Sequence, residues 1–192
     1  MSELEDRLVA ILEDAPGLMR VMAVARELGL PDWMIFSGAI YQPVWNRLTG
    51  RPLEHGLKDY DLAYFDGSDL SYEAEDAVIR RVAAAFDTPL KEMIEVRNQA
   101  RVHLWFEDHF GEAYAPLSCS AEALDRFTAP AFAISARLEM DGRLSIIAPF
   151  GLEDLFALRL QPNPTRPSPA FARTVEAARR RWPEITVEGL LG

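Results

Sequence analysis

The stretch from Trp33 to Asp66 constrains the fold of this chain more than any other. It opens with a short apolar run, breaks at Ser37-Gly38, continues as an amphipathic segment and closes with an alternating strand pattern. Residues i and i+2 of a strand point to the same face, so Asp59 and Asp61 are expected to project side by side. Two hard oxygen ligands at this spacing suit a magnesium ion that also holds substrate phosphates.

The Ser37-Gly38 break predicts a sharp turn between a first strand, Trp33–Phe36, and a helix that ends at Gly50. Glycine has no side chain, so a ligand can approach the backbone closely at this turn. Free N–H groups at the start of the helix, together with the Ser37 hydroxyl, make a phosphate-binding end. Pro43 is expected in the first turn of this helix, where its missing N–H costs little.

Periodicity predicts helices and strands on both sides of this stretch, beginning with a capping box at Ser2. Asn98 is expected to cap a helix, and Asp141-Gly142 indicates a hairpin with a type I′ turn. The expected elements are helices over 4–12 and 18–28, strands over 33–36 and 59–65, a helix over 73–86, a strand over 92–96, helices over 98–111 and 121–127, hairpin strands over 132–138 and 144–147, and helices over 151–160 and 170–182.

A second set of polar residues follows the third expected strand. Glu95 is a carboxylate inside an otherwise apolar run, and Arg97, Asn98 and Arg101 come just after it. The two arginines can reach the oxygens of a triphosphate, which an arginine binds with two parallel hydrogen bonds. A structural interpretation stays open, in which Glu95 pairs with one of these arginines and the two aspartates begin an edge strand.

Composition limits the classes of function. The 192 residues are expected to form one domain with a substantial core. The net charge is −10 and the chain has a single basic run, at 179–181, so a nucleic-acid partner is disfavoured. Cys119 is the single cysteine, so neither a disulfide framework nor a thiolate zinc site is expected. The start of the chain lacks signal-peptide features and no apolar stretch reaches 18 residues, so a cytoplasmic protein without a membrane span is expected.

These features together resemble the polymerase-β-type nucleotidyltransferase superfamily, and more closely a bacterial family of nucleotidyltransferase-like proteins. Asp-x-Asp alone is a weak signal, but several blocks in the right order are a fairly specific one. The resemblance spans roughly Trp33 to Pro164 and is carried by Ser37-Gly38, Trp45, Asp59-x-Asp61, Tyr64-Phe65-Asp66, the block at 95–105 and the block at 148–156.

The resemblance implies an α+β fold with a nucleotidyltransferase-like mixed β-sheet flanked by helices. An N-terminal helical pair over residues 1–30 is expected to pack on the core, followed by the nucleotidyltransferase-like domain over 31–164. A C-terminal helix over 165–192 is expected to belong to that same domain.

The resemblance also implies roles for individual residues. Asp59 and Asp61 match the paired metal ligands, Glu95 is the best match for the third carboxylate, and Gly38 matches the glycine of the phosphate-binding turn. The metal is expected to be Mg²⁺ or Mn²⁺, and the substrate a nucleoside triphosphate. A hydroxyl of a small molecule or protein would attack the α-phosphate and release pyrophosphate, and the third carboxylate would help to deprotonate that hydroxyl.

Two other functions remain open. Ala39 stands where the superfamily usually carries glycine or serine, which favours a catalytically degenerate fold acting as a nucleotide-binding or interaction module. A metal-dependent phosphohydrolase would use the same carboxylates with water as the acceptor.

Overall fold

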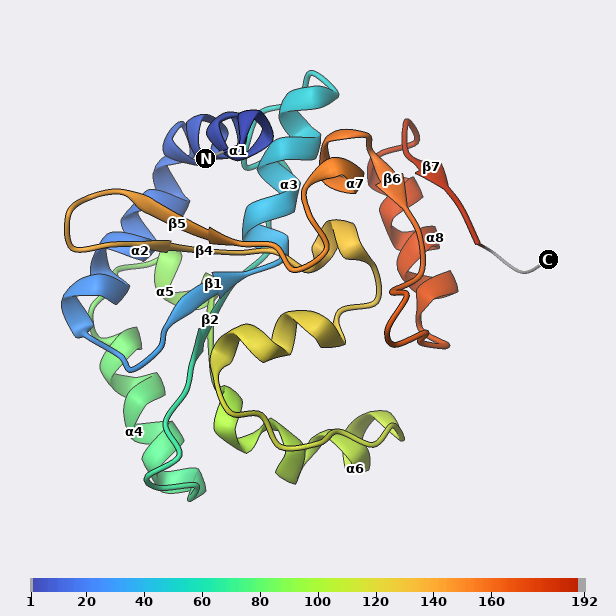
Figure 1. The fold of residues 1–192 in the computed structure, drawn as a ribbon. Helices are drawn as coiled ribbons and strands as arrows, with labels where there is room; N and C mark the ends of the chain where they lie inside the picture. Colours follow the sequence, from blue (N-terminus) through green and yellow to red (C-terminus); the bar gives the residue numbers. More distant parts are fainter. Residues whose placement is uncertain (1, 190–192) are drawn as a thin grey trace.

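A five-stranded mixed sheet lies at the centre of the protein (Figure 1). The computed structural model describes residues 2–189, and the strand order in this sheet is β3-β2-β1-β4-β5. β2 and β3 run parallel, whereas the other neighbouring pairs are antiparallel. The strands are β1 (Met34–Phe36), β2 (Tyr60–Tyr64), β3 (Ile94–Asn98), β4 (Ser135–Leu138) and β5 (Leu144–Ile147). The mixed sheet flanked by helices confirms the predicted α+β class.

Both predicted N-terminal helices are present, as α1 (Glu3–Glu13) and α2 (Pro16–Leu28). The capping box at Ser2 is confirmed, because Ser2 Oγ accepts from the Glu5 N–H and Glu5 accepts from the Ser2 N–H, both at 3.2 Å. Gly29 ends α2 in a left-handed conformation. α1 packs against α3, and α2 packs against β4.

Helix α3 (Gly38–Leu48) runs through the main core and contacts both β1 and β2. Trp45 is completely buried, and its indole N–H donates to the carbonyl of Leu155 at 2.9 Å. Pro43 lies in the second turn, not in the first turn as the sequence led us to expect. The helix continues past it because burial of most of its sides outweighs one missing backbone hydrogen bond.

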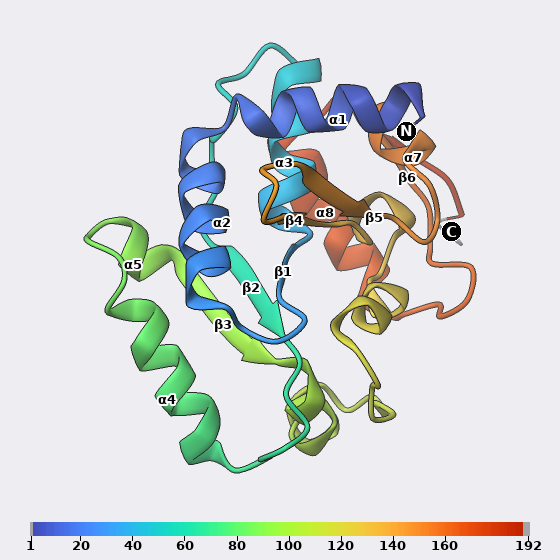
Figure 2. The same ribbon diagram turned by 60° about the vertical axis from the view of Figure 1, so that its left-hand side comes forward.

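The two faces of the sheet carry different side chains. Leu62 and Val96 belong to the main hydrophobic core, which also includes side chains of α1, α2, α3 and α4. Figure 2 shows α2 and α4 on one side of the β2–β3 pair. Phe36 and Ala63 belong to a second, smaller core. Asp61 alternates with Leu62 along β2, so its side chain lies on this second face.

The segment that covers the second face is built from short helices and lies below the sheet in Figure 1. The single helix predicted over 98–111 is divided, because Trp105 leaves the helical conformation at φ −132°. The short helix predicted at 121–127 is present as a 3-10 helix. The elements of this segment are the 3-10 helix η1 (Gln99–Leu104), α6 (Phe106–Phe110), and the 3-10 helices η2 (Ser120–Arg126) and η3 (Pro130–Phe132).

Two helices lie between β2 and β3 in the chain. Helix α4 (Tyr72–Ala83) begins at Ser71, whose hydroxyl accepts from the Ala74 N–H at 3.2 Å. It contacts β3 and is three residues shorter at its end than predicted. A further short helix, α5 (Leu90–Met93), leads directly into β3 and occupies part of the range predicted as strand.

The hairpin of β4 and β5 is confirmed, but its turn type is not. The N–H of Glu139 donates to Arg143 at 2.8 Å, and the N–H of Gly142 donates back to Glu139 at 3.0 Å. A type I′ turn needs positive φ at two consecutive residues, and within this loop only Gly142 has it, at 85°. The loop is therefore a three-residue connection with glycine at the bulge position.

The C-terminal part differs from expectation in one shortened helix and two short strands that were not predicted. The helix predicted over 151–160 is reduced to α7 (Glu153–Phe156), because Leu158 takes a positive φ of 51°. The chain then forms β6 (Arg159–Leu160), which pairs in parallel with β7 (Thr186–Val187). The predicted last helix is present between them as α8 (Phe171–Arg181).

Buried residues of α1, α2 and α8 belong to the same main core as the sheet. The residue boundaries assigned to the three segments, at 30/31 and 164/165, stay predictions. Within residues 2–189 the structure contains no helix with the length and apolar character that a membrane span requires.

Candidate active site

Two of the predicted carboxylates lie next to each other on the second face of the sheet. Asp61 of β2 and Glu95 of β3 are paired residues in the parallel register. Neighbouring strands are about 4.8 Å apart, and paired side chains share a face. Both residues line a cavity of about 380 Å³, together with Ala63 and Arg97. The structure thus brings Asp61, Glu95 and Arg97 to one site.

The pKa of Asp61 is raised from 3.8 to about 6. Burial is the largest cause, followed by the negative charges of Asp59 and Glu95, and Arg97 opposes them. A carboxyl group that is shielded from water and faces two other carboxylates gains from a nearby cation. The electrostatics of the site therefore favour a bound cation or a phosphate-bound metal over a bare cluster of acids.

Asp59 precedes β2 and is half-buried, but it does not line the cavity. Its charge nevertheless acts on Asp61 and on the hydroxyl of Tyr41. In the part of the chain that the structure describes, no three His, Cys, Asp or Glu side chains are arranged to hold a metal ion. Mg²⁺ commonly takes only one or two carboxylates plus substrate phosphates. The donor set of Asp61 and Glu95, with Asp59 beside it, fits such a substrate-dependent ion.

The predicted Ser37-Gly38 turn is present between β1 and α3. Ser37 has φ 44° and ψ −99°, and its N–H donates to the carbonyl of Ile134 at 2.9 Å. Its carbonyl accepts from Ile40 and Tyr41, both at 2.8 Å. Positive φ is unfavourable for a residue with a side chain, so the backbone at Ser37 is strained.

The turn leads to the same end of the sheet as Asp59. Phe36 pairs with Asp61 in the antiparallel register, so the chain beyond Phe36 runs past Tyr60 toward Asp59. The first N–H groups of α3, which begins at Gly38, have no partner within the helix. A Cβ added at Gly38 would lie 3.0 Å from Gln42 Nε2, which leaves little space for a side chain there. Neither Ser37 nor Gly38 lines the cavity, so the structure does not bring this turn into the cavity with Asp61 and Glu95. A role of the helix start in binding phosphate stays a prediction.

Two of the predicted triphosphate contacts have structural roles instead. Asn98 is 2% exposed; its side chain donates to the carbonyl of Asp66 at 2.9 Å and accepts from the Asp66 N–H at 3.0 Å. It also accepts from Ala100, which confirms the predicted cap at Asn98. Arg101 forms a buried ion pair with Glu75 and donates to the carbonyl of Leu70 at 2.8 Å.

This placement corrects the expectation for both side chains. Asn98 alternates with Arg97 along β3 and lies on the opposite face of the sheet. Neither Asn98 nor Arg101 lines the cavity, so both are left out of the candidate site. Arg97 is exposed and lines the cavity, and its contact with a triphosphate stays a prediction. The alternative in which Glu95 pairs with Arg101 is also corrected, since the partner of Arg101 is Glu75.

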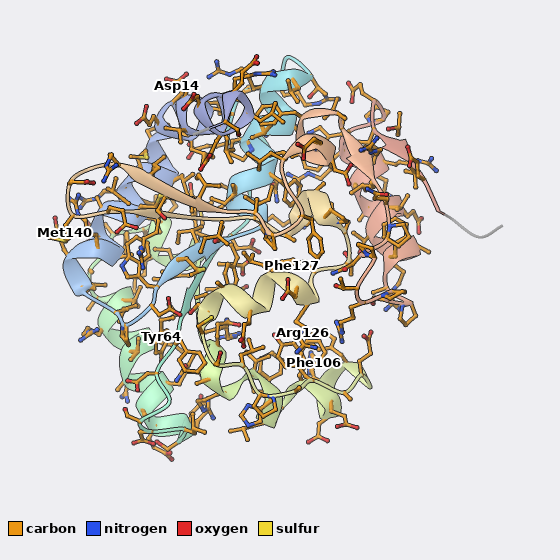
Figure 3. The ribbon with its side chains drawn as sticks, in the orientation of Figure 1. Asp14, Tyr64, Phe106, Arg126, Phe127 and Met140 are labelled. Atoms are coloured by element: carbon orange, nitrogen blue, oxygen red, sulfur yellow. The ribbon has the colours of Figure 1, made fainter. Side chains whose placement is uncertain are left out.

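Sequence reasoning missed the opposite side of the cavity, which is formed by aromatic residues. We call this group the aromatic wall; its members are Trp105, Phe106, Phe110, Tyr114 and Phe127. Figure 3 shows Phe106 and Phe127 below the sheet with Arg126, which also lines the cavity. The density of aromatic residues between 105 and 114 was a usable signal, but the sequence alone favours placing Trp105 in a core.

A further contact missed from the sequence connects α8 to the loop before Asp59. Arg181 Nη2 donates to Gln42 Oε1 at 2.6 Å and to the carbonyl of Gly56 at 2.7 Å. Its guanidinium carbon lies 4.4 Å from the ring centre of Trp182. Of the three arginines at the end of α8, Arg181 is the one that points inward to the loop.

Comparison with known proteins agrees with this geometry. The sequence profile of a nucleotidyltransferase family matches residues 23–187, so the chain belongs to that family. A solved structure described as revealing a CCA-adding enzyme head domain superposes with a TM-score of 0.77 at 19% identity. The superposition covers 96% of this chain and 95% of that one. At this identity the match shows the fold alone. No curated protein matches the chain.

Proposed function

We propose that the protein is a metal-dependent nucleotidyltransferase that moves a nucleoside monophosphate from a nucleoside triphosphate to a hydroxyl group. The observation that carries the proposal is the pairing of Asp61 with Glu95 at the cavity, in a chain of the nucleotidyltransferase family. The acceptor is a small molecule or a protein. The net charge of −10 disfavours a long nucleic acid.

Each residue of the site has a role in this proposal. Asp61 and Glu95, with Asp59 beside them, would hold Mg²⁺ or Mn²⁺. When bound, the metal neutralises charge that develops on the phosphate oxygens. The N–H groups at the start of α3 and the Ser37-Gly38 turn bind phosphate oxygens. Arg97 contributes positive charge from β3.

The reaction is an in-line attack on the α-phosphate. The acceptor oxygen forms a new P–O bond, the bond to the β-phosphate breaks, and pyrophosphate leaves. Glu95 takes the proton of the attacking hydroxyl, because it is the more exposed of the two paired carboxylates and faces the open cavity. Asp61 remains within the group that holds the metal.

A nucleotide-binding protein without turnover is the second candidate. It is favoured by the position of Asp59 outside the cavity lining and by the absence of a preassembled three-ligand group in residues 2–189. Ala39 in the turn supports the same alternative.

The location of the protein in the cytoplasm stays a prediction from the sequence.

The three candidate functions differ in their products. The test incubates the protein with each nucleoside triphosphate and Mg²⁺ or Mn²⁺, with and without a panel of hydroxyl acceptors, and measures pyrophosphate and phosphate. Pyrophosphate released only with an acceptor supports the transferase. Phosphate or pyrophosphate released without an acceptor supports the phosphohydrolase. Metal-dependent binding without any product supports the nucleotide-binding protein.

A further inference from the structure

The aromatic wall differs from the hydrophobic cores because it faces a hollow. Phe110 is 56% exposed, and the other four members are only half-buried. Their rings contact one another: the ring centres of Phe106 lie 4.5 Å from Tyr114 and 4.7 Å from Phe110. Apolar rings gathered at a cavity and left in contact with water gain free energy when another flat, apolar surface covers them.

Arg126 adds a polar group at the same place. Its guanidinium carbon lies 5.2 Å from the ring centre of Tyr114, and the residue lines the cavity. Its Nε is buried and has no hydrogen-bond partner within the described part of the chain. The guanidinium carries further N–H donors, and because the residue lines the cavity these donors are available to an acceptor on a ligand.

The cavity lining therefore contains two chemically distinct groups. The carboxylates Asp61 and Glu95 come from the sheet, and the aromatic wall with Arg126 comes from the segment that covers the sheet. Its volume of about 380 Å³ is within the range of about 300–1,000 Å³ typical of small-molecule sites. A ligand that suits both groups has a flat ring with a hydrogen-bond acceptor on its edge, joined to a group that reaches the carboxylates.

We infer that the aromatic wall and Arg126 bind a nucleobase. A base has two flat faces that stack on aromatic side chains, and its edge carries oxygen and nitrogen acceptors for the guanidinium of Arg126. The inference rests on the proposed function in that the base belongs to a nucleotide or nucleoside. It deepens that function by assigning the ring-binding end of the site. The ring comes either from the donor triphosphate or from a nucleoside acceptor.

The test measures affinities by calorimetry with the full chain. The probes are each nucleoside triphosphate, each free nucleoside and inorganic tripolyphosphate, all with Mg²⁺. The variants are Phe110→Ala, which changes an already exposed ring, and Arg126→Met, which keeps the apolar stem and removes the donor. Tyr72→Ala is the matched control, because Tyr72 is 66% exposed and lies outside the cavity.

If the ring comes from the donor, nucleoside triphosphates bind more tightly than tripolyphosphate. Phe110→Ala and Arg126→Met then weaken them about 5- to 150-fold and leave tripolyphosphate unchanged. If the ring comes from an acceptor, free nucleosides bind beside tripolyphosphate and lose affinity in the same two variants. In both cases Tyr72→Ala binds as the wild type does.

Failure of this inference is distinguishable from failure of the proposed function. If triphosphates and tripolyphosphate bind equally and neither variant changes them, and free nucleosides do not bind, the inference is overturned while the proposed function stands. If no triphosphate binds at all, the proposed function fails. In that case the free nucleosides alone test the inference. If they bind and Phe110→Ala and Arg126→Met weaken this binding, the inference stands. If they do not bind, the inference is overturned.

Discussion

Asp61 and Glu95 are paired residues on two parallel strands, and both carboxylates face one cavity. Two acids so placed repel each other when both are ionised, and burial of Asp61 adds to the penalty. The protein without a bound ligand is therefore less stable than it would be without this pair of acids. The same arrangement provides oxygen ligands where a phosphate and a divalent cation can meet.

The first prediction concerns the stability of Asp61→Asn. The folded pKa of Asp61 is about 6 and the unfolded value is near 3.8, so the native state binds more protons between these values. Stability therefore falls as pH rises from about 4 to about 6. Asp61→Asn removes this penalty and is expected to be more stable than the wild type at pH 7, by about 3 kcal/mol. Chemical denaturation at pH 7 and near pH 3.5 checks this, since the advantage disappears at the lower pH.

Asp69 is the matched control, and its substitution is expected to change the stability in the opposite direction. Asp69 accepts a hydrogen bond from the Ser71 N–H at 2.8 Å, and this bond lowers its pKa. Asp69→Asn is therefore expected to lower the stability at pH 7. An Asp61→Asn variant that is less stable than the wild type at pH 7 would contradict the electrostatic account.

The second prediction separates the two arginines that follow Glu95. Arg101→Ala leaves Glu75 as a buried charge without its partner, and is expected to cost about 3–5 kcal/mol. Arg97→Ala removes an exposed side chain at the cavity, and is expected to leave the melting temperature within 2 °C, about the shift that 0.5 kcal/mol produces. Thermal melting of both variants, followed by triphosphate binding at a temperature where both are folded, distinguishes them.

The expected binding results run the other way. Arg97→Ala weakens triphosphate binding, and Arg101→Ala binds normally once folded. An Arg101→Ala variant that is as stable as the wild type and fails to bind would restore the original expectation that Arg101 contacts the ligand.

The third prediction uses the strained turn at Ser37. Ser37→Gly relieves the positive φ of 44° and is expected to raise stability by about 1 kcal/mol. Ala39→Gly, two residues away inside α3, is expected to lower stability by at least about 1 kcal/mol, because Ala39 is helical and completely buried. Denaturant unfolding of the two variants compares them. A loss of stability in Ser37→Gly would show that the Ser37 side chain makes contacts that outweigh the strain.

The fourth prediction concerns the inward-pointing arginine of α8. Arg181→Ala removes the donors to Gln42 and to the carbonyl of Gly56, and is expected to cost about 1–3 kcal/mol. Arg180, which pairs with Glu176 on the surface, is the control, and Arg180→Ala is expected to cost less than about 0.5 kcal/mol. Thermal melting compares the two, and equal effects would contradict the role given to Arg181.

The sequence predicted the local parts of this molecule well. The alternation around Asp61 fixes which side chains share a face of β2, and the capping box at Ser2 needs only residues close in the chain. What it did not provide was the partner of each strand. The register that places Glu95 beside Asp61, and the separation of Asn98 from Arg97 by the sheet, follow from pairing between distant segments.

The missing half of the candidate site has the same origin. The aromatic wall is assembled from Trp105 after η1, from α6, from Tyr114 in the loop after α6, and from Phe127 after η2, so no short window reveals it. Periodicity favoured a single helix over 98–111, and in that helix Trp105 is expected on the face that packs against a core. Arg181 reaches the loop before Asp59 from the other end of the chain, which is also a tertiary relationship.

The most direct test of the central claim is ligand-dependent thermal melting of the wild type and Asp61→Asn, each compared with its own ligand-free state. A ligand that binds only the folded protein raises the melting temperature by mass action. The account predicts a shift with at least one nucleoside triphosphate that requires Mg²⁺ or Mn²⁺ and is lost in Asp61→Asn, although that variant is the more stable one without ligand. An unchanged shift in Asp61→Asn, or no shift with any triphosphate and metal, would contradict it.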